Sequence, residues 1–120
     1  MKKNFVFAVF FMVIMAGCAE KEKNYDVTLM EVMSSSCGAC EKMKPAMDKI
    51  KQKYKDSDAV NVIVYDTTTE KGAEIAAKYG VHHLPALIFL DKEKREYFRS
   101  EQPQPAGVIS AVIEAKAGDE

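Results

Sequence analysis

Short apolar runs alternate with amphipathic segments from residue 27 onward. Residues 27–33 are apolar and β-prone except for Thr28 and Glu31, which predicts a strand buried on both faces. Two further apolar runs predict strands at residues 60–65 and 86–90, and residues 95–99 are expected to return as a strand at the edge of the sheet. The last two are joined by a short charged turn, so we expect them to form an antiparallel hairpin.

The segments between these strands carry apolar residues at helical spacing. In residues 37–54 the apolar positions fall on one face of a helix, and Pro45 inside this helix should bend it. Thr67 and Glu70 have the spacing of a capping box and predict the start of a second helix. Gly80 is expected to end this helix in the left-handed conformation.

A last helix is expected to begin at Pro105 and to end before Gly118. Its predicted buried face contains Val108, Ile109, Val112 and Ile113. The resulting order, β-α-β-α-β-β-α, predicts one α/β domain over residues 27–118, with helices on both faces of a mixed sheet. A right-handed crossover makes the first two strands parallel, and the hairpin adds antiparallel strands.

The first residues follow a different pattern, in which two lysines precede an unbroken apolar run over residues 5–16. These twelve residues fall short of the roughly 20 that span a bilayer, so we interpret the run as the core of a signal peptide. Ala16 and Gly17 then lie directly before Cys18, which resembles the lipobox of bacterial lipoproteins. The resemblance implies that residues 1–17 are removed and that Cys18 is lipidated. An ordinary secretory signal with an incidental cysteine is the alternative.

Composition limits the partners of the chain. Residues 18–26 are polar and charged, as is typical of a tether between an anchor and a folded domain. The 120 residues are 48% hydrophobic and 29% charged, which fits one globular domain, and we expect a monomer. The formal net charge is −1, which argues against a nucleic-acid partner. Once Cys18 is lipidated, the thiols left are Cys37 and Cys40, and export places them in an oxidising compartment.

Cys37 and Cys40 form a CxxC motif at the predicted start of the first helix. A helix N-terminus has unsatisfied N–H groups and a positive dipole, so it favours the thiolate form of Cys37 and makes it the nucleophile. Cys40, one turn further on, is close enough to attack a mixed disulfide on Cys37. Half of a zinc site and a static bridge are the alternatives. The sequence has neither a second CxxC nor an HxxxH to complete zinc coordination.

Four features occur together around this motif. The CxxC follows a strand, Pro45 lies five residues after its second cysteine, and Glu31 lies six residues before its first. A Tyr-Gly-Val-x-x-x-Pro run ending at Pro85 precedes another strand. In these features residues 27–116 resemble the thioredoxin family, and more narrowly its small exported members. The resemblance implies a thioredoxin-like three-layer fold, with a central mixed sheet of about four strands flanked by helices.

The resemblance also implies roles for two residues outside the CxxC. Pro85 is expected to follow a cis peptide bond, to face the cysteines and to let its neighbour's backbone pair with an extended substrate. A trans proline at the start of a strand is the alternative. Glu31 is a carboxylate in an apolar strand, where burial would raise its pKa and make it a proton acceptor for Cys40. A glutamate that reaches solvent at a strand edge is the alternative.

His82 and His83 precede Pro85, and together with the cysteines they have the chemistry to bind copper or zinc. We expect them to be loop residues, and we expect no metal and no cofactor. A copper- or metal-handling lipoprotein on the same fold is the alternative function.

The motif differs from that of most thioredoxins, because Ser36 replaces the usual Trp before the first cysteine and Ala39 replaces the usual Pro. No charged residue lies between the cysteines, so the thiolate is less stabilised and the dithiol is a better reductant. We therefore expect a protein-disulfide reductase on the extracytoplasmic side of a membrane. Its expected partners are disulfide-bearing exported proteins and a membrane electron donor of the thiol-reducing type. An oxidase or isomerase and a redox-inert binding module are the alternatives.

Overall fold

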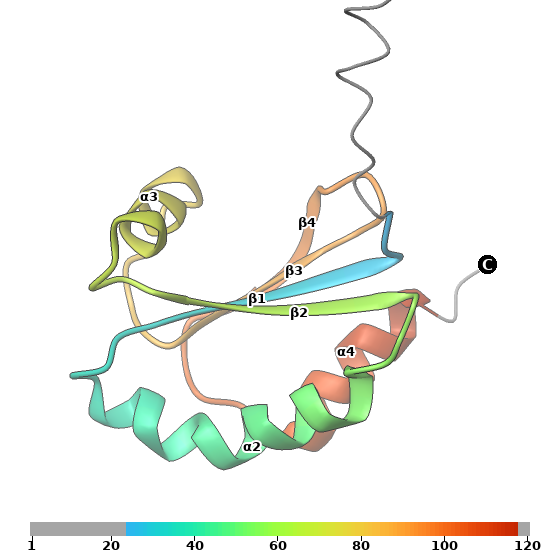
Figure 1. The fold of residues 1–120 in the computed structure, drawn as a ribbon, viewed down its shortest axis with the longest axis horizontal. Coiled ribbons are helices and arrows are strands. Elements are labelled where there is room, and N and C mark those ends of the chain that lie inside the picture. Colours follow the sequence, from blue (N-terminus) through green and yellow to red (C-terminus); the bar gives the residue numbers. More distant parts are fainter. Residues whose placement is uncertain (1–23, 118–120) are drawn as a thin grey trace, which may run out of the picture.

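The structure, a computed structural model, describes residues 24–117 (Figure 1). Its strands are β1 (Val27–Met33), β2 (Val60–Asp66), β3 (Ala86–Leu90) and β4 (Glu96–Ser100). Its helices are α2 (Gly38–Tyr54), α3 (Glu70–Lys78) and α4 (Ala106–Ala117). The predicted signal peptide, Cys18, most of the tether and Gly118 lie outside the described residues. Within residues 24–117, every helix is too short or too polar to cross a bilayer.

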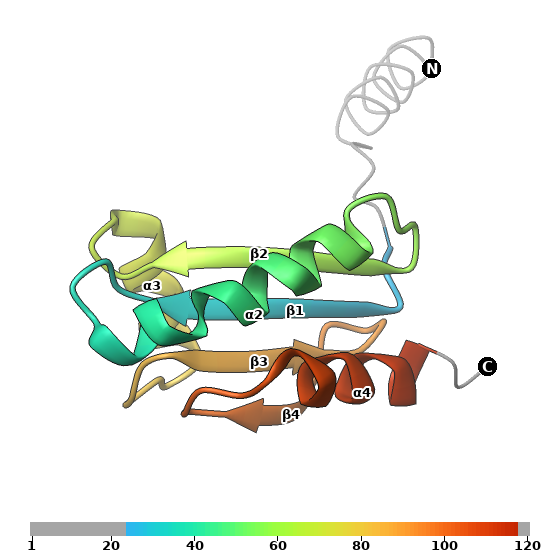
Figure 2. The same ribbon diagram turned by 90° about the horizontal axis from the view of Figure 1, so that it is seen from below.

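The four strands form one mixed sheet in the order β2-β1-β3-β4. β1 runs parallel to β2, with Val27 opposite Val60, and antiparallel to β3, with Val32 opposite Ala86. β4 is antiparallel to β3 at the edge of the sheet. α2 and α4 cover one face of the sheet, and α3 covers part of the other (Figures 1 and 2). The predicted three-layer α/β fold is confirmed.

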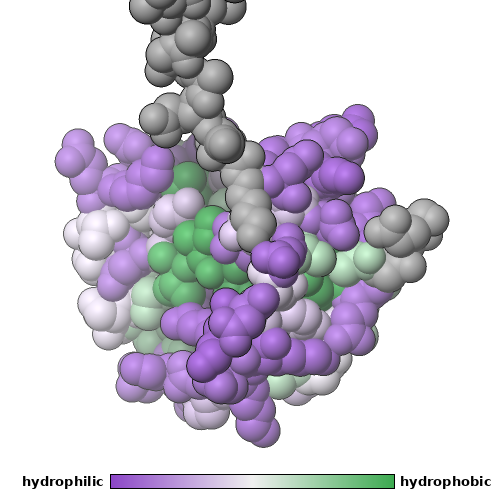
Figure 3. Space-filling view, turned by 45° about the vertical axis from the view of Figure 1, so that its right-hand side comes forward, coloured by the Kyte–Doolittle hydropathy of each residue, from purple (hydrophilic) through white to green (hydrophobic). Residues whose placement is uncertain are grey.

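β1 supplies both hydrophobic cores, because it lies between two other strands and its side chains alternate between the faces. Leu29 packs in the core beneath α2 and α4, whereas Met30 and Val32 pack in the core on the α3 side. Leu29 and Val32 have no exposed surface. On the face shown in Figure 3, polar side chains surround an apolar area near the centre of the view.

The direction of β1 determines where the loops gather. Its first residue, Val27, lies at the end of the sheet that holds the β3–β4 hairpin, because Thr28 pairs with Leu90. Its last residue, Met33, lies at the other end, beside the last residue of β2. The loops that precede α2, α3, β3 and α4 therefore all leave the sheet at this second end (Figure 2).

The predicted capping box at the start of α3 is wrong, because the N-cap is Thr69 and not Thr67. The Asp66 carboxylate accepts the backbone N–H of Thr68 at 2.9 Å and its hydroxyl at 2.8 Å. These bonds hold the chain in a turn after β2, so the helix starts two residues later than the spacing suggests. The Thr69 hydroxyl then accepts the N–H of Gly72 at 3.0 Å.

The predicted end of α3 at Gly80 is confirmed. Gly80 has a φ of 62°, the left-handed conformation that glycine adopts without a steric cost. The Gly80 N–H donates to the Ala77 carbonyl at 3.2 Å, and the Val81 N–H donates to the Ala76 carbonyl at 2.9 Å. This pair of bonds is a Schellman motif, which directs the chain from α3 back toward β3.

α4 begins directly after Pro105, as predicted, but its buried face is narrower than expected. Ile109 and Ile113 are buried, and Val112 packs against the same core, whereas Val108 is 42% exposed. α4 contacts the sheet and α2 along a stripe centred on Ile109 and Ile113. Val108 therefore lies outside the stripe, although its apolar character fits the helical period.

Gly72 lies where α3 approaches the last residue of β2. A Cβ at this position would meet the carbonyl carbon and oxygen of Asp66, which are backbone atoms with little freedom to move. We expect Gly72→Ala to lower the free energy of unfolding by roughly 1–3 kcal/mol in urea denaturation, even though alanine favours helix. Gly107→Ala in α4 is the matched control, because nothing lies within 4 Å of a Cβ there. Equal effects of the two substitutions would contradict the close approach.

Candidate active site

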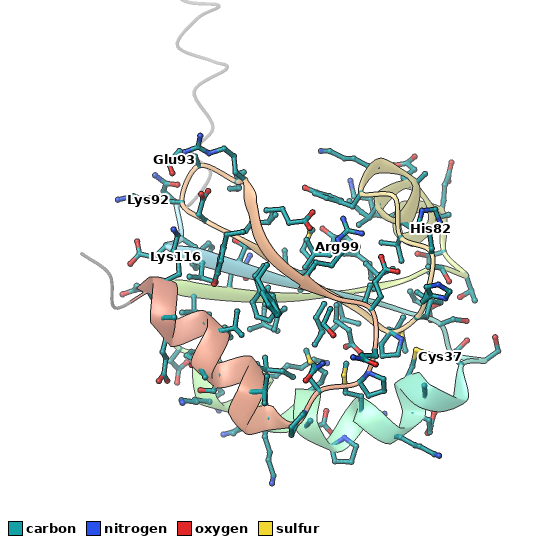
Figure 4. The ribbon with its side chains drawn as sticks, turned by 180° about the vertical axis from the view of Figure 1, so that it is seen from behind. Cys37, His82, Lys92, Glu93, Arg99 and Lys116 are labelled. Atoms are coloured by element: carbon teal, nitrogen blue, oxygen red, sulfur yellow. A yellow bond between two sulfur atoms is a disulfide. The ribbon has the colours of Figure 1, made fainter. Side chains whose placement is uncertain are left out.

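Cys37 and Cys40 lie at the end of the sheet where β1 stops. After Met33 the chain turns through Ser34, whose carbonyl accepts the N–H of Cys37 at 3.1 Å. The Ser34 hydroxyl also accepts the N–H of Ser36 at 3.2 Å. These local bonds end the strand and place Cys37 as the N-cap of α2. Figure 4 shows Cys37 at the end of the molecule opposite the hairpin that carries Lys92 and Glu93.

The two cysteines form a disulfide, with their Cα atoms 5.2 Å apart, and they differ in exposure. Cys37 is partly exposed, whereas Cys40 is 3% exposed. The Cys37 sulfur accepts the backbone N–H of Cys40 at 3.1 Å, one of the N–H groups that the first turn of α2 leaves unpaired. A reduced Cys37 would meet the same N–H and the positive end of the helix dipole, and both favour its thiolate.

Glu31 lies inside the sheet, and it is 5% exposed. It lines a pocket of about 240 Å³ together with Cys40 and with Asp48 and Lys51 of α2. Burial raises the pKa of the Glu31 carboxyl to about 7; nearby Lys51 opposes this rise and Asp48 adds to it. The predicted burial is therefore confirmed, and the alternative of a solvent-reaching glutamate at a strand edge is wrong, because β1 is a central strand.

Pro85 follows a cis peptide bond with Leu84, as predicted, so the alternative of a trans proline is wrong. Pro85 is buried at the start of β3. Because Val32 is opposite Ala86, the next step along the antiparallel pair brings Pro85 beside Met33, where the chain leaves β1 for Cys37. The cis proline and the disulfide therefore share one end of the sheet.

His82 and His83 are exposed in the loop before Leu84, and Figure 4 shows His82 at the same end of the molecule as Cys37. The backbone N–H of His83 donates to the Glu101 carboxylate at 3.1 Å. Across residues 24–117, no three or more His, Cys, Asp or Glu side chains are grouped so that they could hold a metal ion.

Sequence reasoning missed two sets of charged residues near this site. Asp48 and Lys51 belong to the charged side of α2, yet they act on Glu31 across the pocket. The spacing of Lys51, four residues after the core residue Met47, was the available signal, because it puts Lys51 on the same side of α2. Arg99 and Glu101 lie at the end of β4, and they contact the loop before Pro85. That contact joins segments about 20 residues apart, so no local spacing indicates it.

The pKa of Glu31 has a consequence for stability. The folded chain keeps a proton on Glu31 up to about pH 7, whereas the unfolded chain loses it near the ordinary pKa of 4.5. The contribution of Glu31 to stability is therefore complete below about pH 4.5 and is lost as the pH rises to about 7. For the oxidised wild type we expect the free energy of unfolding to fall by on the order of 2–3 kcal/mol between about pH 5 and pH 8 because of Glu31. In Glu31→Gln this fall should be absent.

Urea denaturation of the wild type and Glu31→Gln at both pH values measures this difference. Glu74→Gln, an exposed carboxylate on α3, is the control and should keep the wild-type pH dependence. If Glu31→Gln also keeps the wild-type profile, Glu31 is not protonated in the folded chain at neutral pH.

Comparison with known proteins agrees with this geometry. Residues 19–115 match the family model described as thioredoxin. The chain is 26% identical over 124 aligned positions to a probable protein disulfide-isomerase A6 of Medicago sativa, covering 96% of this chain and 34% of that protein. It is 31% identical to the chloroplastic thioredoxin-like protein HCF164 of Oryza sativa subsp. japonica, covering 64% of this chain and 29% of that protein.

Solved structures show the same fold at lower identity. The structure of thioredoxin-2, described as a component of the malaria parasite protein secretion machinery, superposes with a TM-score of 0.69 at 22% identity, covering 82% of this chain and 89% of that one. The chain spans about a third of the length of the two curated relatives above. Because the family model matches residues 19–115, well over half of the 120 residues, the chain belongs to the thioredoxin family.

Proposed function

We propose that the chain is a thiol–disulfide oxidoreductase that reduces disulfides in exported proteins. The observation that carries the proposal is the pairing of a partly exposed Cys37 at a helix N-terminus with a buried Cys40 in one disulfide. Of these two cysteines, Cys37 is accessible to a partner and Cys40 is placed to complete the exchange. Family membership supports the class of reaction.

In the first step the reduced chain reacts through Cys37. Its thiolate attacks one sulfur of a substrate disulfide, a bond forms between Cys37 and that sulfur, and the substrate S–S bond breaks. The other substrate sulfur leaves as a thiolate and takes a proton from water. The Cys40 N–H and the α2 dipole stabilise the attacking thiolate before this step.

In the second step Cys40 gives up its proton and its thiolate attacks the Cys37 sulfur. The Cys37–Cys40 disulfide forms, the mixed disulfide breaks, and the second substrate sulfur leaves as a thiolate. Two electrons have then passed from the chain to the substrate. Glu31 is the proposed proton acceptor, because it lines the same pocket as Cys40 and its pKa of about 7 allows it to exchange a proton at neutral pH. The pocket is also large enough to hold a bridging water.

Pro85 is proposed to help hold the substrate during this exchange. The cis bond places Pro85 beside the loop that leads to Cys37, where it cannot donate a hydrogen bond of its own. The backbone of Leu84 is then the group that would pair with an extended segment of substrate.

The proposed direction is reduction, and the proposed place is outside the cytoplasm. Gly38 and Ala39 add no charge between the cysteines, so the thiolate receives less stabilisation than in strongly oxidising members of this fold. The apolar run over residues 5–16 and the small residues before Cys18 support export and a lipid anchor. A membrane electron donor of the thiol-reducing type would return the two electrons. Mass spectrometry of the N-terminal peptide tests the anchor, since an unmodified Cys18 in the exporting cell would exclude it.

Cys40→Ser tests whether Cys37 attacks the substrate and Cys40 resolves the mixed disulfide. Without Cys40 the second step is blocked, so we expect stable mixed disulfides through Cys37, visible as adducts on a non-reducing gel and released by dithiothreitol. Cys37→Ser, with the buried cysteine alone, should form few or none. Adducts with exported proteins support the proposed location. If Cys40→Ser forms no adduct in the exporting cell, or forms as many as Cys37→Ser, the mechanism fails.

The reduction potential of the Cys37–Cys40 pair tests the direction. We expect a value near the about −270 mV of thioredoxin, measured by equilibration of the chain with glutathione or dithiothreitol redox buffers. A value near −120 mV would instead indicate an oxidant.

A further inference from the structure

Arg99 of β4 uses all the donors of its guanidinium group. Its Nε and Nη2 bind the Glu96 carboxylate in a bidentate pair at 2.8 and 2.9 Å. Its Nη1 donates to the Glu101 carboxylate at 2.9 Å. The remaining donors point at the carbonyl oxygens of Tyr79 and Gly80, at 2.5 and 3.4 Å. A planar fork with five N–H groups can make this set of bonds, whereas a lysine ammonium with three donors cannot.

Tyr79 is the C-cap of α3 and Gly80 follows it, so both carbonyls lie at the C-terminal end of the helix, where the dipole is negative. Arg99 therefore binds the end of α3 with a positive charge at the place where a positive charge is favourable. This contact holds the end of α3 against β4, the edge strand next to β3.

Glu101 extends the same connection into the loop. One carboxylate oxygen accepts from Arg99, and the other accepts the backbone N–H of His83 at 3.1 Å. Burial acts to raise the pKa of Glu101, but hydrogen bonds from Arg99 and from the backbone of His83 and His82 hold it below its usual value, so Glu101 stays ionised. The chain from Tyr79 to His83 is thus fixed to β4 at two points, directly before the cis bond of Pro85.

The Arg99–Glu101 pair is less exposed than the Lys53–Glu114 pair on the surface of α2 and α4. The side chains of Arg99 and Glu101 are 24% and 20% exposed, whereas those of Lys53 and Glu114 are 49% and 56% exposed. Exposed pairs contribute little because solvent screens them. Arg99 and Glu101 are better shielded, and besides the Glu96 carboxylate their partners are backbone groups between Tyr79 and His83, so they act on the position of that segment.

We propose that Arg99 and Glu101 are positioning residues that hold the loop before Pro85 for binding of extended protein-disulfide substrates. The proposal rests on the proposed function, because it assigns the pair a role in substrate binding at the same site. Neither Arg99 nor Glu101 takes part in the proposed exchange between the cysteines and the substrate disulfide. Their effect should therefore fall on substrates that need the loop backbone, and not on the reactivity of Cys37 itself.

Kinetics with two probes separate these effects. Insulin presents a disulfide within extended chain, whereas Ellman's reagent is a small disulfide with no backbone to pair. We expect Arg99→Lys and Glu101→Ala each to raise KM for insulin roughly tenfold, with kcat and the rate with Ellman's reagent within about twofold of wild type. The double variant should be no worse than either single one, because the pair acts as a unit.

Arg95→Lys is the matched control for Arg99→Lys. Arg95 pairs with Asp91 and Glu93 in the distant hairpin, and its side chain is 76% exposed. Arg95→Lys should leave KM and kcat for insulin and the rate with Ellman's reagent unchanged. If the rates with insulin and Ellman's reagent fall together in the Arg99 and Glu101 variants, or if neither changes, the positioning role is wrong.

Amide hydrogen exchange provides a readout that does not depend on turnover. We expect the His83 amide to exchange at least about tenfold faster in Glu101→Ala and Arg99→Lys, while the Ile88 amide of β3 stays as slow as in wild type. An unchanged His83 amide, or equal acceleration of both amides, overturns the proposal. Should the wild type reduce neither probe, the proposed function fails, and the exchange of the His83 amide still decides whether the pair holds the loop.

Discussion

The structure depends on the enclosure of β1 between β2 and β3. Because both edges of this strand are paired and both faces are covered, its side chains build the two cores on which α2, α3 and α4 pack. The same strand carries Glu31 into an apolar setting and ends at the turn that starts α2. One buried strand therefore sets the charge state of the carboxyl and the position of Cys37. A change that loosened β1 would disturb the fold and the site together.

Much of this arrangement could be predicted from local sequence. The apolar runs indicated β1, β2 and β3, whereas the edge strand β4, which is not an apolar run, was indicated by the charged turn that returns the chain after β3. The CxxC placed Cys37 at a helix start, and Gly80 indicated the end of α3, since both follow from backbone geometry over a few residues. The cis bond at Pro85 came from family resemblance and not from spacing alone. The burial of Glu31 followed from its apolar neighbours in the strand.

The errors and omissions have physical causes. Thr67 was the wrong cap because the Asp66 carboxylate competes for the backbone of the turn, and spacing does not show which of two local hydrogen-bonding patterns wins. Val108 fits the helical period, but how wide a stripe α4 buries depends on its neighbours. Arg99 reaches the end of α3 across about 20 residues of chain, a contact that only the folded sheet creates.

The course of β1 has one more consequence. Its seven residues rise about 3.3 Å each, so the point where the preceding segment joins the domain lies roughly 20 Å from the end that leads to Cys37. A chain held at a bilayer by residues before Val27 would be attached at the end of the domain opposite its sulfurs. The length and stiffness of the residues before Val27 would then set how near Cys37 could come to the lipid, and so which depth of partner it could meet.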